Sequence, residues 1–175
     1  RALVLCGRTV ASGDLRPMTR AALGDRFAGV FDRVGSHTPL AMVHEITSVL
    51  AASGADAVVT VGGGSAIDAG KGAMLLQTAG TDLAPYCVRY DAGGRMSQRR
   101  LPPARLVHVA IPTTSGSASE VMPTAGIRDV EARKKLLFWD DALIPQGVIL
   151  DPVMVAPTNA FLSAASGMTA VARCV

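Results

Sequence analysis

The chain has 175 residues, of which 49% are hydrophobic and 18% are charged. This composition excludes a disordered chain and is sufficient for one core of ordinary size. The net charge of +3, from 17 basic and 14 acidic residues, is too small to indicate nucleic-acid binding. No apolar run is long enough to cross a membrane and no signal peptide is visible. We therefore expect a globular protein with neither a nucleic-acid nor a membrane partner.

The three cysteines favour a reducing compartment. Cys6, Cys87 and Cys174 form no CxxC pair, and their number is odd. Because disulfides are rare in the cytosol, we expect a cytoplasmic protein with free thiols. Cys6 lies within a predicted strand and is interpreted as a small core residue.

Apolar, β-branched runs alternate with helical patterns along the chain. Residues 2–6 predict a first strand, and a helix is expected over much of 15–23. A short second strand follows at 29–32. Apolar residues then recur at helical spacing over 40–53, and the segment 37–39 before them supplies a helix-start signal.

A glycine turn joins the third strand to the next helix. Residues 56–60 predict a buried strand, the turn is Val61-Gly62-Gly63-Gly64, and a helix is expected over 65–77. The first N–H groups of such a helix and the positive end of its dipole favour phosphate binding. Glycine would allow a pyrophosphate to approach the backbone closely. The alternative is a glycine turn that serves the fold alone.

The second half continues the alternation after a long connection. Residues 79–104 are rich in Gly and Pro and are interpreted as irregular. A buried strand follows at 106–111, then a small antiparallel hairpin of 124–127 with 135–138, a strand at 147–150 and a helix from 158 onward. This order predicts an α/β fold, with a Rossmann-like, mostly parallel sheet, helices on both faces and a small β-hairpin.

A second polar turn follows the strand at 106–111. It contains five hydroxyl side chains within seven residues: Thr113, Thr114, Ser115, Ser117 and Ser119. Hydroxyl groups both donate and accept, so they suit the ribose and amide groups of a nucleotide. The alternative is a serine-rich helix cap. Two such turns, each at the carboxyl end of a strand, favour a nucleotide cleft.

These motifs together resemble the iron-containing alcohol dehydrogenase superfamily, which includes the maleylacetate reductases. The matching segments are GGGSAIDAGK, IPTTSGSASE, and LDP followed by AASGM. The resemblance covers the whole chain but only the N-terminal half of a typical member. It implies an NAD(P)-binding α/β domain at 1–157 and the start of the family's C-terminal helical domain at 158–175. The rest of that all-helical domain is absent from this chain.

The resemblance also implies cofactor-binding residues. Gly63, Gly64 and Ser65 match residues that hold the pyrophosphate, and Asp68 matches the acid of the same motif. Four hydroxyl positions match residues that line the cleft, and Lys135 resembles a lysine that reaches the ribose near the nicotinamide. For Lys135, a solvated charge on the hairpin is the alternative. The full set is Gly63, Gly64, Ser65, Asp68, Thr113, Thr114, Ser117, Ser119 and Lys135.

The sequence departs from the family at the metal site. Metal-dependent members carry Asp and, four residues later, His as the first two iron ligands, where this chain has Thr169 and Arg173. Thr is a poor ligand and Arg has no lone pair to offer, so we expect neither iron nor zinc there. Arg173 could instead hold a substrate carboxylate, or be a charge on the helix surface. Segment 30–39 resembles the maleylacetate reductases, which work without metal, whereas the hydroxyl turn is of the longer alcohol dehydrogenase type.

The cofactor is expected to be NAD or NADP. NAD-selective members carry an acid after the first strand, and this chain has Gly7 followed by Arg8. With no acid at this place and the base Arg8 beside it, a 2′-phosphate would be tolerated, so use of NADP or of both cofactors is expected.

The leading hypothesis is thus an NAD(P)-dependent oxidoreductase that acts on a small alcohol, aldehyde or maleylacetate-like substrate, with a homodimer allowed. A non-catalytic nucleotide-binding module is the alternative, and a lyase of the dehydroquinate synthase type is disfavoured by the missing ligands. We name no catalytic residue.

Overall fold

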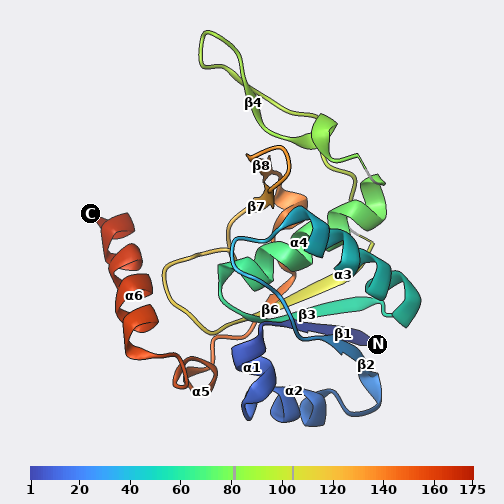
Figure 1. Cartoon of the computed structure of the whole chain (residues 1–175), viewed down its shortest axis with the longest axis vertical. Helices are drawn as coiled ribbons and strands as arrows, with labels where there is room; N and C mark the ends of the chain where they lie inside the picture. Colours follow the sequence, from blue (N-terminus) through green and yellow to red (C-terminus); the bar gives the residue numbers. More distant parts are fainter. Residues whose placement is uncertain (81, 104) are drawn as a thin grey trace.

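A five-stranded parallel sheet forms the centre of the molecule (Figure 1). The computed structural model describes residues 1–80, 82–103 and 105–175. The strands lie in the order β2-β1-β3-β6-β9 and all pair in parallel. Their bounds are β1 Ala2–Cys6, β2 Phe27–Phe31, β3 Ala57–Gly62, β6 Val107–Pro112 and β9 Gly147–Val148. The predicted α/β fold with a mostly parallel sheet is confirmed.

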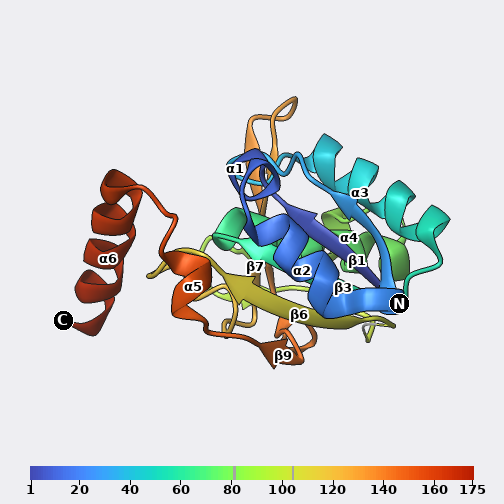
Figure 2. The same cartoon turned by 90° about the horizontal axis from the view of Figure 1, so that it is seen from below.

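Helices cover both faces of this sheet, as predicted (Figures 1 and 2). On one side, Leu3 and Leu5 of β1 pack into a core with α3 (Leu40–Ser53) and α4 (Gly64–Ala79). On the other side, Val4 and Cys6 pack with α1 (Arg8–Ser12), α2 (Leu15–Leu23) and α5 (Pro152–Val155). Successive side chains of a strand point to opposite faces, so β1 contributes to both cores. The fully buried Cys6 agrees with its interpretation as a core residue.

The predicted hairpin is also present and forms a further layer outside α4. It pairs β7 (Thr124–Asp129) with β8 (Lys134–Trp139) in antiparallel fashion. Two glycines let α4 pack closely on both sides. A Cβ on Gly70 would lie 2.6 Å from Cγ2 of Thr60 in the sheet, and one on Gly72 would lie 2.7 Å from Cδ1 of Ile127 in the hairpin. Larger residues here would push the layers apart.

Several element boundaries differ from the prediction. The second strand begins two residues earlier than expected, and the strand expected at 147–150 pairs only at Gly147 and Val148. The short helices α1 and α5 were not predicted, because each is too short to show a periodicity. The connection 79–104, predicted to be irregular, contains a two-stranded hairpin, β4 (Arg89–Tyr90) with β5 (Met96–Ser97); within it, residues 81 and 104 lie outside the described part.

The C-terminal helix α6 (Ala160–Cys174) lies at one side of the molecule, away from the sheet (Figure 2). It begins two residues later than predicted, because Asn159 caps it by accepting a hydrogen bond from the Leu162 N–H at 2.9 Å. None of its residues is buried. Among the described residues, no helix is both long and apolar enough to span a bilayer.

Candidate functional site

The carboxyl ends of β1, β3 and β6 meet at one edge of the sheet, where the order of strands reverses. The chain leaves β1 towards β2 on one side, whereas β3 and β6 follow on the other. Ligands of open parallel sheets bind at such a reversal. A groove of about 530 Å³ opens here. It is lined by the turns after these strands and by the start of α6, including Gly7, Gly35, Ser36, Gly62, Gly63, Gly64, Ser65, Thr113, Thr114, Thr158 and Asn159.

The N-terminus of α4 opens into this groove without a cap. Gly63 is the N-cap residue, and it has no side chain that could accept from an N–H group of the first turn. The first N–H groups of a helix have no acceptor within the helix, so those of Gly64 and Ser65 are oriented for an external acceptor. Such N–H groups, together with the helix dipole, favour an anion. The predicted phosphate turn therefore lies open to the groove, and phosphate binding there stays a prediction.

The glycines of this turn also serve the packing of the two turns on each other. A Cβ on Gly63 would lie 2.9 Å from Oγ1 of Thr114, and one on Gly64 would lie 2.9 Å from Cβ of Ser117. These Cβ atoms would point towards the hydroxyl turn. The sequence analysis left open whether these glycines serve a ligand or the fold, and the structure shows that the fold requires them.

The hydroxyl turn is irregular backbone rather than the cap of a helix. Residues 113–119 contain no helix, and none starts directly after them, so the helix-cap alternative is wrong. The Thr113 N–H donates to the Gly62 carbonyl at 3.0 Å, and the Thr158 hydroxyl donates to the Thr113 carbonyl at 2.7 Å. Thr113 and Thr114 line the groove beside the glycine turn. The two predicted turns are thus held together at the edge of the sheet.

Asp68 ties three segments together beside the groove. Its carboxylate accepts hydrogen bonds from the Ser119 hydroxyl at 2.9 Å and from the Gly126 N–H at 3.0 Å. Burial raises the pKa of the Asp68 carboxyl, while these two bonds and the charges of Lys71 and Lys135 act in the opposite direction. Asp68 therefore links α4 to the hydroxyl turn and to the β7–β8 hairpin.

Two of the predicted hydroxyl groups lie behind the groove surface. The Ser119 hydroxyl is used by Asp68, and the Ser117 Oγ accepts from the Ser119 N–H at 3.4 Å while packing on Gly64. Neither residue is among those that line the two pockets at this edge. Direct contact of Ser117 and Ser119 with a cofactor stays a prediction.

A second pocket, of about 710 Å³, adjoins the groove at Ser65, which lines both. Its lining includes Asp68, Gly126 and Lys135 together with further basic side chains of the hairpin. The predicted site residue Lys135 is exposed, as the alternative of a solvated charge required. Its Cε nevertheless lies only 2.7 Å from where a Cβ on Gly126 would be. Lys135 thus crosses the hairpin at its one glycine, towards Asp68.

Sequence reasoning missed the contribution of the loop before α3. Thr38 was interpreted as part of a helix-start signal, but its hydroxyl donates to the Ser65 carbonyl at 3.1 Å. The His37 N–H donates to the Ser65 hydroxyl, also at 3.1 Å. Both residues have positive φ angles, 62° at His37 and 51° at Thr38. No local sequence signal announces these contacts, because their partner lies 27 or 28 positions away.

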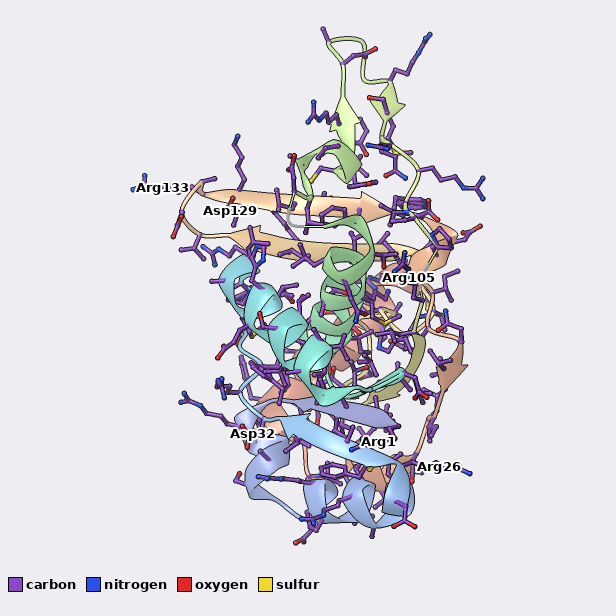
Figure 3. All side chains as sticks on the ribbon, turned by 90° about the vertical axis from the view of Figure 1, so that its right-hand side faces the viewer. Arg1, Arg26, Asp32, Arg105, Asp129 and Arg133 are labelled. Atoms are coloured by element: carbon purple, nitrogen blue, oxygen red, sulfur yellow. The ribbon has the colours of Figure 1, made fainter. Side chains whose placement is uncertain are left out.

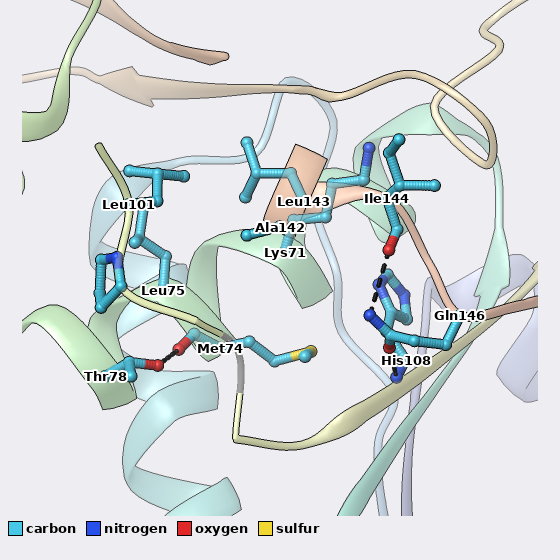
Figure 4. A pocket seen from close by; sticks show the side chains of 11 residues that line it. Lys71, Met74, Leu75, Thr78, Leu101, His108, Ala142, Leu143, Ile144 and Gln146 are labelled. Carbon is cyan, nitrogen blue, oxygen red and sulfur yellow. Dashed lines mark hydrogen bonds between the residues drawn. The ribbon is translucent and has the colours of Figure 1, made fainter. Parts of the chain in front are cut away.

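Two buried polar side chains, Lys71 and His108, line a further pocket (Figure 4). The Lys71 ammonium donates to the carbonyls of Met122 and Thr124, each at 2.8 Å. Burial lowers the pKa of Lys71 to about 8. The neighbouring His108 bonds through Nε2 to the Thr60 hydroxyl at 2.9 Å, and burial lowers the pKa of its imidazole to about 3. Lys71 therefore fastens the segment between the hydroxyl turn and the hairpin to α4.

The two positions that resemble iron ligands lie on α6 and do not fit a divalent metal. The Thr169 hydroxyl donates to the Ala165 carbonyl at 3.0 Å, and the Arg173 guanidinium donates to the Ser117 carbonyl at 2.8 Å. A guanidinium offers no lone pair and would repel a cation. In the described part of the chain, no group of three or more His, Cys, Asp or Glu residues is placed to hold a metal.

Arg173 thus anchors α6 to the hydroxyl turn. A second contact is at Gly116, with a φ of 82°, where a Cβ would lie 2.2 Å from the Ser166 carbonyl oxygen. The residue at 116 must be glycine both for its backbone conformation and for this approach.

Comparison with known proteins agrees with this geometry. The sequence model of a family described as "Iron-containing alcohol dehydrogenase" matches residues 1–152. The chain is 32% identical over 175 residues to a 4-hydroxybutyrate dehydrogenase of Cupriavidus necator. This match covers all of this chain and 44% of the relative. It is 34% identical over 146 residues to a 1,3-propanediol dehydrogenase of Klebsiella pneumoniae, covering 83% of this chain and 35% of the relative.

A solved structure shows the same architecture. The maleylacetate reductase of Agrobacterium tumefaciens superposes with a TM-score of 0.73 at 28% identity, over 98% of this chain and 40% of that one. The chain therefore spans less than half the length of the relatives it matches.

Proposed function

Since the chain belongs to the iron-containing alcohol dehydrogenase family, we propose that it binds NAD or NADP in the groove between the glycine turn and the hydroxyl turn. We further propose that it forms the cofactor-binding part of a dehydrogenase. The observation that carries the proposal is the uncapped N-terminus of α4, which opens into a groove of about 530 Å³ at the strand-order reversal. A pyrophosphate is the ligand group that such a helix end favours.

The residues divide into three roles in this proposal. The backbone at Gly63, Gly64 and Ser65 holds the pyrophosphate, because its N–H groups lie at the positive end of the helix. The hydroxyl groups of Thr113 and Thr114 bond to the nucleoside parts that lie along the groove, with Ser117 and Ser119 supporting the turn or reaching the cofactor themselves. Asp68 and Lys135 hold the nicotinamide end, since they line the pocket on the far side of Ser65.

The chemistry that a bound nicotinamide supplies is hydride transfer to or from the carbon of a small alcohol, aldehyde or keto acid. The task of this chain is to hold and orient that ring. Thr38 and His37 restrain Ser65 through the hydrogen bonds already described. Asp68 restrains the hairpin that carries Lys135. Both sets of hydrogen bonds fix Ser65 and the hairpin in position without a bound ligand.

No step of this proposal passes through a metal. The family name implies iron, but the side chains at the first two ligand positions are a threonine bonded to its own helix and an arginine. Their chemistry does not fit a divalent cation. We propose that this protein, like the reductases of the family that its sequence resembles, works without one.

The cofactor preference follows from the edge of the groove after β1. Gly7 lines the groove, whereas Arg8 is not among the lining residues. The proposal that NADP is accepted therefore rests on the missing acid at Gly7 and not on a base that binds the phosphate. Gly7 has an extended conformation, with a φ of −86° and a ψ of 169°, which other residues also adopt.

A substitution at Gly35 tests the proposal without disturbing the two turns. Gly35 lines the groove, and a Cβ there would meet nothing closer than the Met42 sulfur at 3.9 Å. Gly35→Asp places a negative charge in the groove, and we expect calorimetric titration to show at least about tenfold weaker binding of NADH, or 1.4 kcal/mol.

The matched neutral variant Gly35→Asn controls for side-chain volume and should bind within about threefold of the wild type, a change of under 1 kcal/mol. Equal affinities of wild type and Gly35→Asp would contradict the placement of the cofactor. Gly64→Val is unsuitable as a test, because a Cβ at Gly64 already conflicts with Ser117.

A further inference from the structure

The pocket beyond Ser65 has four lysine or arginine residues among the ten residues that line it. Its charged side chains are Asp68, Arg128, Arg133, Lys134 and Lys135, with His37 at its edge. Four basic residues thus face a single carboxylate. That carboxylate is already engaged by the Ser119 hydroxyl and the Gly126 N–H. The pocket is therefore a site of strongly positive potential that favours an anion.

Two of these cations lie directly opposite each other on one face of the hairpin. Arg128 of β7 and Lys135 of β8 are register partners. Side chains at such positions project from the same face, with Cβ atoms about 5 Å apart, and like charges there destabilise a sheet. Within the described ranges, none of the four basic residues has an ion-pair partner within 4 Å. An anion between Arg128 and Lys135 would remove this repulsion.

The loop before α3 fixes the backbone that carries Arg128. Its N–H donates to the Thr38 carbonyl at 2.9 Å, and Arg128 forms an isolated parallel bridge with Pro39. On the opposite strand, Lys135 passes over Gly126, where a side chain would collide with it at 2.7 Å. The loop before α3 therefore positions Arg128, and the missing side chain of Gly126 leaves room for Lys135. Both cations line the pocket. The hairpin tip with Arg133 extends from this region towards solvent (Figure 3).

We propose that this pocket binds the acid group of a small carboxylic-acid substrate, held between Arg128 and Lys135. The inference rests on the proposed function, because the pyrophosphate of the dinucleotide would occupy the groove on the other side of Ser65. None of the four basic residues lines that groove, so the cofactor's own phosphates do not account for them. The substrate class is an alcohol, aldehyde or ketone that carries a carboxylate at its far end.

Arginine and lysine suit this task in different ways. A guanidinium can hold both oxygens of a carboxylate at once, whereas an ammonium is a point charge that can also donate to a ribose hydroxyl. Arg128 is therefore assigned to the carboxylate, and Lys135 is shared between substrate and cofactor. A neutral diol would lack the group that this pocket is built to hold.

The probe is succinate, titrated into the protein saturated with NADH and followed by the backbone amide signals of residues 126–128 and 134–135. We expect saturable shifts with succinate and none with its neutral analogue succinamide. Arg128→Gln should weaken succinate binding by about tenfold, the effect of removing one charged bidentate contact. Added chloride should weaken it as well, because the site is exposed.

Arg26→Gln is the control, since Arg26 is an exposed arginine at the opposite end of the molecule from Arg133 (Figure 3). It should leave succinate binding unchanged. Equal binding of succinate and succinamide, or equal effects of Arg128→Gln and Arg26→Gln, would overturn the inference. NADH affinity is measured separately for each variant. If NADH binds and succinate does not, the substrate proposal fails alone; if NADH does not bind, the proposed function fails.

Discussion

Removal of the Asp68 carboxylate should destabilise the protein because three segments meet there. In Asp68→Ala, the Gly126 N–H and the Ser119 hydroxyl lose their acceptor. Hydrogen bonds to a charged group contribute about 1.5–3 kcal/mol each. Part of this is offset, because the variant no longer buries a carboxylate whose pKa is raised by its surroundings. We expect the free energy of unfolding to fall by about 2–4 kcal/mol.

Asp68→Asn is the matched control for this prediction. The amide oxygen can still accept from the Gly126 N–H, and the amide nitrogen can donate to the Ser119 hydroxyl, so the loss should be about 1 kcal/mol. Urea unfolding followed by far-UV circular dichroism gives both values. A loss below about 0.5 kcal/mol for Asp68→Ala, or equal losses for the two variants, would refute the role of Asp68 as a tie.

The pH dependence of the same variants gives an independent check. The pKa of Asp68 is raised above its ordinary value of 3.8 in the folded state. The folded protein therefore holds this proton more tightly than the unfolded chain does. Stability should fall as pH rises from about 3.8 through the raised folded pKa. Asp68→Asn should lack this part of the pH dependence, and an identical pH profile for both proteins would contradict the cause assigned to the shift.

Three further predictions follow from the site. Gly7→Asp should weaken NADPH binding at least about tenfold more than NADH binding in calorimetric titration, because the new acid would repel the 2′-phosphate; equal effects on both cofactors would count against this placement. Burial lowers the pKa of Lys71 to about 8 from an ordinary 10.5, so the unfolded chain binds its proton more tightly than the folded protein does. The stability of the wild type relative to Lys71→Met should therefore rise by roughly 3 kcal/mol between pH 8 and 10.5. Urea unfolding measures this difference, and a difference independent of pH would contradict the prediction. Elemental analysis of protein purified without chelator should find less than about one tenth of an equivalent of iron or zinc; a full equivalent that is lost in Thr169→Ala with Arg173→Ala would show that these residues do form a metal site.

The sheet was predictable because its strands carry their own signals. β1, β3 and β6 are apolar runs that end in a glycine or a polar turn, and the periodicity of α3 is visible over 14 residues. Short elements were not predictable. α1 and α5 have five and four residues, which is too few for a helical period to appear, and tertiary contacts decide their conformation.

The candidate site was predictable in its residues more than in its contacts. The glycine turn and Thr113 with Thr114 could be placed together, because each follows a neighbouring parallel strand. The positions of Thr38 and Arg128 could not, since they depend on a loop that reaches Ser65 and bridges to the hairpin. The sequence also could not show which contacts require glycine at positions 63 and 64. Only the packed structure shows that their missing side chains would meet Thr114 and Ser117.

The most direct test of the account is where the dinucleotide binds. NADH and NADPH are titrated into the isotopically labelled protein while its backbone amide signals are recorded. The account predicts saturable binding with the largest shifts at residues 62–66 and 113–114, which line the groove. Absence of binding up to about 1 mM, or saturable binding whose largest shifts lie outside the groove and the pocket beside it, would contradict the central claim.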